Sequence, residues 1–107
     1  MLTRAETKSL VEAEAQMALL PLVHAKGYRT TAGDLVAAMD AYRLRAMGRI
    51  PGLSQCTEED VSLLAAHALA DYAKRQESLR PACLEMAGLP DEANILRTSR
   101  LVGGGNG

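Results

Sequence analysis

Apolar residues recur at helical spacing in three long segments, each of which begins with a threonine three residues before a carboxylate. The segments "TRAE", "TAGD" and "TEED" start at Thr3, Thr31 and Thr57. A threonine oxygen at such a position accepts a hydrogen bond from an otherwise unpaired backbone N–H of the first helical turn, and the helix dipole favours the acid there. The pattern predicts three helices that begin just after these threonines.

The first predicted helix runs from about Arg4 to Lys26 and ends at Gly27, which has no Cβ and suits a left-handed cap. Pro21 interrupts the helix, because proline lacks a backbone donor and its ring clashes with the preceding turn. We therefore expect a kinked first helix, or two short helices that meet near Leu20. The predicted apolar stripe consists of Leu10, Ala13, Met17 and Leu20, followed by His24.

The second predicted helix spans residues 32–47 and ends at Gly48. Pro51 and Gly52 interrupt the segment that follows, so we predict a connecting loop over residues 49–56. One face of this helix carries the apolar residues Leu35, Met39, Tyr42 and Ala46.

The third predicted helix, residues 58–76, contains "VSLLAAHALADYA", which is apolar nearly all round. A helix of this pattern is typically surrounded by other helices or by a partner, and we expect it at the centre of the bundle. Two shorter helices follow, in "SLRPACLEMAG" and "PDEANILRTSRL", with a proline in the first turn of each. The glycine-rich residues 102–107 are predicted to form a flexible tail after a single domain of residues 1–101.

The composition supports an all-α fold. The chain has 18 alanines and 16 leucines but only three tyrosines, and it lacks phenylalanine and tryptophan. Alanine and leucine favour helices, whereas strands are rich in aromatic and β-branched residues. A length of 107 residues fits one domain. We predict a compact bundle of four or five helices, mainly antiparallel.

Charge and cysteine usage narrow the classes of partner. The formal net charge of −1 provides no long-range field that would attract a polyanion, so nucleic-acid binding is disfavoured. Cys56 and Cys83 are far apart and match no disulfide or zinc pattern, which indicates reduced thiols and a cytoplasmic protein. The start "MLTRAETKSL" has no apolar core of a signal peptide, and no later apolar run has the length of a bilayer span.

The segment "YRLRAMGRIPG", residues 42–52, is the strongest candidate for a functional site. Arg43 and Arg45 point about 200° apart on a helix, so they do not share a face, whereas Arg45 and Arg49 do align. A basic finger for nucleic acid is therefore disfavoured. We select five residues as a candidate site for a protein partner: Tyr42, Arg43, Arg45, Met47 and Arg49.

The same arginines also have a purely structural interpretation. Basic side chains near the end of a helix are stabilised by the helix dipole without any ligand. Arg43 follows Asp40 by three residues and can form an ion pair with it. The segment alone does not separate this interpretation from partner binding.

A helix-turn-helix DNA-binding regulator is the alternative function. "HAKGYRTTAGDLVAAM" offers a helix end, a short turn at Gly27 and a second helix, and Lys26 and Arg29 could contact phosphates. In that motif, however, the first residues of the second helix face the bases. Here these residues include Asp34, and a carboxylate next to phosphates is unfavourable.

The residues that could carry catalysis or bind a metal are scattered. No two of His24, Cys56, His67 and Cys83 lie within ten residues of each other, whereas zinc ligands usually occur in close pairs. His67 and Asp71 are four residues apart on one helix, but no nucleophile or phosphate-binding loop accompanies them. We therefore expect no enzyme activity, no cofactor and no metal.

These expectations favour a small non-enzymatic helical protein that acts through protein–protein interaction, as an adaptor, inhibitor or assembly subunit. Apolar residues surround the third helix and widen the apolar face of the first near Pro21, more than a short chain can bury. Large apolar patches mark interaction sites, and symmetric dimers are the commonest homo-oligomers. A homodimer or a complex with a protein partner is therefore expected. The residues concerned are Leu19, Leu20, Leu22, Val23, Leu63, Leu64, Ala66, Leu69 and Ala70.

Overall fold

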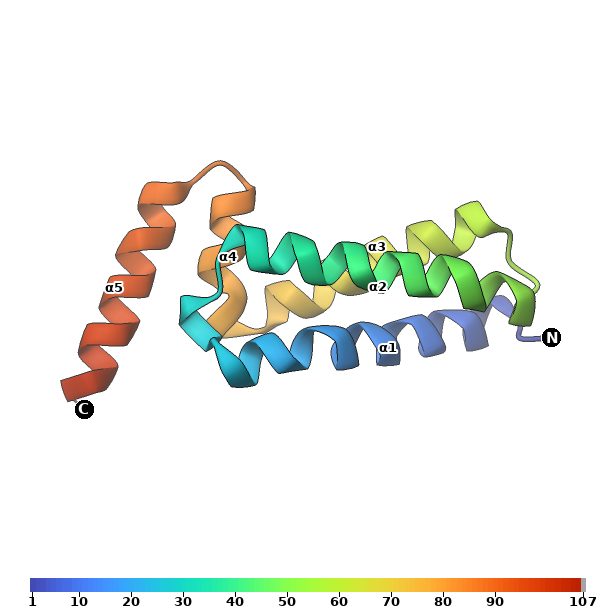
Figure 1. Ribbon diagram of the computed structural model, residues 1–107, viewed down its shortest axis with the longest axis horizontal. Helices are drawn as coiled ribbons and strands as arrows, with labels where there is room; N and C mark the ends of the chain where they lie inside the picture. The colour runs from blue at the N-terminus through green and yellow to red at the C-terminus, as the bar shows by residue number, and fades with distance from the viewer. Residues whose placement is uncertain (107) are drawn as a thin grey trace.

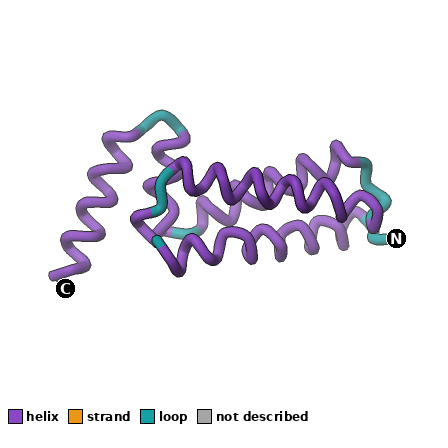
Figure 2. Tube along the Cα trace, in the orientation of Figure 1, coloured by secondary structure: helices purple, strands orange, loops and turns teal. Residues whose placement is uncertain are grey.

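Helices occupy most of the chain in a computed structural model, which describes residues 1–106 (Figure 1, Figure 2). No strand occurs within these residues, and the only β-type pairing among them is an isolated bridge between Leu2 and Ser54. The predicted all-α class is confirmed. The elements are α1 (Arg4–Ala25), a 3-10 turn η1 (Gly27–Arg29), α2 (Ala32–Leu53), α3 (Glu58–Arg75), a 3-10 turn η2 (Glu77–Leu79), α4 (Arg80–Met86) and α5 (Pro90–Asn106).

Three long helices lie along the longest dimension of the molecule, which measures 52 × 26 × 19 Å. Figure 1 shows α1 leading away from the N-terminal end, α2 returning to it and α3 leading away again. We call α1, α2 and α3 the long-helix region. The short α4 and the longer α5 lie at the far end of this region, where α5 packs against α4 and η1.

The three threonines cap the long helices as the sequence predicts. Thr3, Thr31 and Thr57 each accept a hydrogen bond at 3.1–3.2 Å from the backbone N–H three residues further on. Glu6 and Asp34 complete the first two caps, because their carboxylates accept the N–H of Thr3 and Thr31 at 3.1 Å. The Thr3 N–H lowers the pKa of Glu6, so this cap is strongest when the carboxylate is charged.

The core lies between the three long helices, and α3 contacts both α1 and α2 along its length. The prediction that other helices surround α3 is wrong, because each long helix contacts the other two and the outer surface of α3 is exposed. Leu64 is only partly buried, and Leu63 is 55% exposed. The fully buried apolar residues of the long-helix region are Val11, Ala15, Leu19, Leu35, Tyr42, Ala46, Ile50, Val61, Ala65 and Leu69.

The stripe predicted for α1 is wrong by about one residue, or about 100° around the helix. Thr7, Val11, Ala15 and Leu19 face the core, whereas Ala13, Met17 and Leu20 are exposed. Thr7 explains the difference, since its buried hydroxyl donates to the carbonyl of Thr3 at 2.7 Å and lies 2.6 Å from the Ser54 hydroxyl. A polar residue thus occupies a core position that an apolar stripe would not include.

Pro21 lies inside α1, which continues to Ala25 as one helix. The alternative of two short helices that meet near Leu20 is therefore wrong, while the kink stays a prediction. At the other end of the chain, α5 reaches Asn106, so the predicted tail overlaps the end of a helix. Residue 107 lies outside the described residues, and the flexibility of the tail also stays a prediction.

The predicted end of the second helix at Gly48 is wrong, because α2 continues to Leu53. Gly48 does not adopt a positive φ, unlike Gly27, which ends the first helical segment at φ 53°. Ile50 is fully buried, so continuing the helix brings another apolar side chain into the core. The segment from Arg49 to Leu53 is consequently helical rather than a loop.

Candidate functional site

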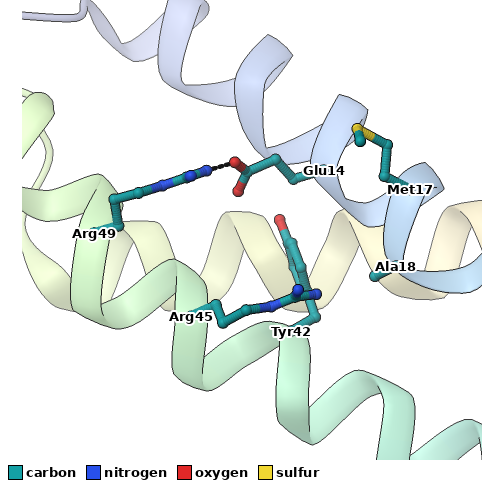
Figure 3. A pocket seen from close by; sticks show the side chains of 6 residues that line it. All are labelled: Glu14, Met17, Ala18, Tyr42, Arg45 and Arg49. Carbon is teal, nitrogen blue, oxygen red and sulfur yellow. Dashed lines mark ion pairs between the residues drawn. The ribbon is translucent and has the colours of Figure 1, made fainter.

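A groove of about 520 Å³ runs between α1 and α2 (Figure 3). The two helices lie side by side here, and each contributes three of the lining side chains. We call this feature the α1–α2 groove. Its lining residues are Glu14, Met17 and Ala18 from α1, and Tyr42, Arg45 and Arg49 from α2.

Tyr42 forms the floor of the α1–α2 groove. Its side chain is buried in the core, and its hydroxyl donates a hydrogen bond to the carbonyl oxygen of Val11 at 2.8 Å. Burial raises the pKa of Tyr42 to about 12, against a smaller opposing effect of the Arg45 guanidinium. Tyr42 therefore holds α2 against α1 and stays neutral, and its 1% exposure leaves little of it for a partner to contact.

The rim of the groove combines opposite charges with one long apolar side chain. Arg49 forms an ion pair with Glu14 across the groove (Figure 3). Arg45 is exposed and forms no ion pair with the side chains that the structure describes. Met17 projects from α1 and is 74% exposed. The groove thus presents an unpaired cation and a flexible apolar side chain to the surroundings.

The five residues predicted as a partner-binding site lie on two sides of α2. Tyr42, Arg45 and Arg49 line the α1–α2 groove, which confirms that Arg45 and Arg49 align. Arg43 and Met47 lie elsewhere on the helix, in a second hollow of about 340 Å³ lined also by Asp40 and Leu44. The separation follows from the helical period, because Arg43 and Arg45 point to different faces.

The predicted ion pair between Asp40 and Arg43 is not formed, although both side chains line the second hollow. Sequence reasoning also missed Glu14 and Met17, which belong to the groove. The apolar spacing of the first helix assigns Met17 to the buried stripe, and no sequence pattern marks Glu14 as part of a site. Only the packing of α1 on α2 brings them within reach of Arg45 and Arg49.

The remaining chemically interesting side chains do not converge. Within the described residues, no three His, Cys, Asp or Glu side chains are grouped so that they could hold a metal ion. Cys56 and Cys83 are both free and half-buried, and burial raises the pKa of the Cys83 thiol, which favours the protonated form over a nucleophilic thiolate. His67 and Asp71 are exposed on α3.

The junction between α1 and α2 differs from a helix-turn-helix. In that motif the two helices meet at about 90–120°, whereas α1 and α2 lie side by side along most of the molecule (Figure 1). Asp34 in the first turn of α2 accepts a hydrogen bond from the Lys26 ammonium at 2.9 Å. This bond lowers the pKa of Asp34, so a carboxylate marks the end of the helix that would face DNA.

Among the residues that the structure describes, no helix combines the length and the apolar character that a bilayer crossing needs. The chain matches no protein-family model, and it has no significant match among curated proteins or solved structures.

Proposed function

We propose that this chain is a non-enzymatic protein-binding module, an adaptor, inhibitor or assembly subunit, and that its partner binds at the α1–α2 groove. The observation that carries the proposal is that the exposed Met17 of α1 and the exposed Arg45 of α2 line one groove, together with the buried Tyr42. Methionine is common at binding surfaces because its unbranched side chain adapts to different shapes. Arginine is enriched among the residues that dominate binding energy.

The groove chemistry indicates the kind of partner surface. An apolar side chain of the partner would pack against Met17 and Ala18, and a carboxylate would pair with Arg45. The Glu14–Arg49 ion pair spans the groove near this point, so it limits how far along the groove a partner can extend. The partner we expect is a protein segment that carries an acidic residue next to an apolar one.

The proposal extends to oligomeric state and location. We expect a complex with a protein partner, a homodimer or both, in the cytoplasm. Two free cysteines within the described residues support a reducing compartment. The net charge of −1 disfavours DNA as the partner. The helix-turn-helix regulator is therefore the alternative that the experiment below tests.

The direct test is affinity capture from the native host with the purified chain as bait, followed by mass spectrometry. Met17→Asp and Arg45→Glu should each lose a partner that the unchanged chain retains, because each alters one side of the groove. With the partner in hand, calorimetry should show at least about a tenfold weaker Kd for each variant, or about 1.4 kcal/mol.

Leu63→Asp is the matched control, since Leu63 is exposed on α3 and lies outside the groove. This variant should retain the partner, and circular dichroism should show that all three variants are folded. Equal capture by the groove variants and the unchanged chain would contradict the proposed site. Recovery of DNA instead of protein, with loss in Arg45→Glu, would favour the DNA-binding alternative.

A further inference from the structure

The outward face of α2 carries four residues at a spacing of 4, 3 and 4 positions. They are Val36, Asp40, Arg43 and Met47, and we call them the outer seam of α2. This spacing is that of the two core positions in a heptad repeat, so the four side chains lie along one stripe of the helix. Leu44 borders this stripe and is 76% exposed.

The outer seam does not overlap the α1–α2 groove. Arg45 and Arg49 line the groove, whereas Arg43 and Met47 line the hollow of about 340 Å³ on the other side of α2. The two surfaces can therefore be occupied at the same time. The molecule that binds the outer seam can therefore differ from the partner that binds the groove.

The charges of the outer seam are unpaired within the part of the chain that the structure describes. Neither Asp40 nor Arg43 takes part in an ion pair. Both lie at the hollow, next to the exposed Leu44. A partner that fits this surface needs a cation for Asp40, an anion for Arg43 and apolar side chains for Val36 and Met47.

The outer seam itself has this pattern when it is read in the opposite direction. Reversed, its spacing is again 4, 3 and 4, its two charged residues exchange places, and an apolar residue stands at each end. A two-fold axis midway between Asp40 and Arg43 would place each aspartate opposite the arginine of a second copy. The same axis would place Val36 opposite Met47 at both ends of the contact.

We propose that two copies of this chain associate through the outer seam, with their α2 helices antiparallel about that two-fold axis. Contacts of this kind use the same surface patch on both subunits, which must be complementary to itself. A parallel, in-register pair would bring like charges together at Asp40 and at Arg43. The antiparallel arrangement instead forms two ion pairs, each between Asp40 of one copy and Arg43 of the other.

The expected dimer is weak and depends on concentration. The seam spans 11 residue steps, about 16 Å of helix, and exposed ion pairs add little to affinity. Their effect is instead on register and orientation, as with polar residues in coiled-coil seams. Reversing the charges of Asp40 and Arg43 therefore tests the antiparallel arrangement more directly than measuring the affinity of the dimer.

The test is sedimentation velocity over a wide concentration range with the full chain and three variants. D40R and R43D should each shift self-association to at least tenfold higher concentration, because each seam then carries two like charges. An equimolar mixture of these two variants should associate again at the original concentration. The double variant D40R/R43D should self-associate as the unchanged chain does, but it should not pair with the unchanged chain.

D71R is the matched control, because it makes the same charge change at an exposed position of α3, outside the outer seam. It should leave self-association unchanged. A chain that stays monomeric at every concentration overturns the proposal. So does a dimer that is insensitive to both single charge reversals, or a mixture of D40R and R43D that fails to associate.

Discussion

The long-helix region and α5 are held in place by different kinds of interaction. Each of the three long helices contributes at least three buried apolar residues to one core. Among the described side chains of α5, only Ala93 is buried, and it does not belong to that core. Helix α5 packs on α4 through Ala93 and the half-buried Leu96, and its largest set of polar contacts comes from Arg97, whose side chain is 18% exposed.

Arg97 connects α5 to two other elements at once. Its guanidinium donates to the carbonyl oxygens of Tyr28 at 2.9 Å and Thr30 at 3.1 Å, both next to or within η1. It also forms an ion pair with Glu85 of α4. The stability of the long-helix region is shared among many apolar contacts, whereas the polar part of the attachment of α5 depends on one side chain. The difference leads to four predictions.

The largest effect is expected in the long-helix region. Leu19→Ala removes a fully buried side chain and leaves a cavity, so the free energy of unfolding should fall by about 2–5 kcal/mol. Chemical denaturation measures this loss. Met17→Ala, two residues away on the exposed face of the same helix, should change stability by less than about 0.5 kcal/mol. Similar losses in both variants would contradict the buried face of α1.

The second prediction concerns α5 alone. Arg97→Met removes hydrogen bonds to a charged donor, so the free energy of local opening of α5 should fall by about 1.5–3 kcal/mol. Hydrogen exchange should then be about tenfold to a hundredfold faster in α5 amides, with little change in the amides of α3.

Arg100→Met is the control for this variant. Arg100 pairs with Glu77 at 2.7 Å, but both side chains are about half exposed, and exposed pairs contribute little. Exchange in α5 should therefore be nearly unchanged. If Arg97→Met accelerated exchange equally in α3 and α5, then α5 would unfold only together with the long helices.

A smaller effect is expected at the start of α3. Thr57→Ala removes the acceptor for the Asp60 N–H and should lower the free energy of unfolding by about 1 kcal/mol. The loss should affect the whole long-helix region, since α3 packs on both α1 and α2. Thr98→Ala, an exposed change within α5, should alter the melting temperature much less. An unchanged melting temperature in Thr57→Ala would show that the Thr57 cap does not contribute to the stability of the protein.

The smallest effect concerns the one tyrosine in the core. Tyr42→Phe removes the hydroxyl that donates to the Val11 carbonyl and should lower the free energy of unfolding by about 0.5–1 kcal/mol. Because the pKa of Tyr42 rises from 10.0 to about 12, the folded chain keeps this proton where the unfolded chain loses it. Stability should therefore fall as the pH rises from 10 towards 12.

Ultraviolet titration of the tyrosines checks this assignment. In the unchanged protein one phenol should ionise near pH 12, and that step should be absent in Tyr42→Phe. If the high-pH step persisted in the variant, it would belong to another tyrosine, and Tyr42 would not be the buried group.

Local sequence signals predicted the long-helix region better than the C-terminal part. The caps at Thr3, Thr31 and Thr57 are local, so a segment of four residues suffices to identify each of them. The face of α2 was also correct, from Leu35 to Ala46. The buried face of α1 was not, because Thr7 satisfies its hydroxyl with Ser54, 47 residues away.

The attachment of α5 and the groove could not be predicted for the same reason. Arg97 has the pattern of a basic residue near a helix end, yet it binds carbonyl groups 67 and 69 residues away. The position of Glu14 opposite Arg49 likewise depends on how α1 packs against α2. Helical spacing correctly separated Arg43 from Arg45, because that separation is a property of one helix.

The polar attachment of α5 also has a calorimetric consequence. The heat capacity change of unfolding comes mainly from newly hydrated apolar surface, and hydration of polar groups has the opposite sign. Release of α5 uncovers the small side chain of Ala93 and the covered part of Leu96, together with the polar groups around Arg97. Detachment of this helix would thus contribute only a small part of the heat capacity change, and the main endotherm would report on the long-helix region.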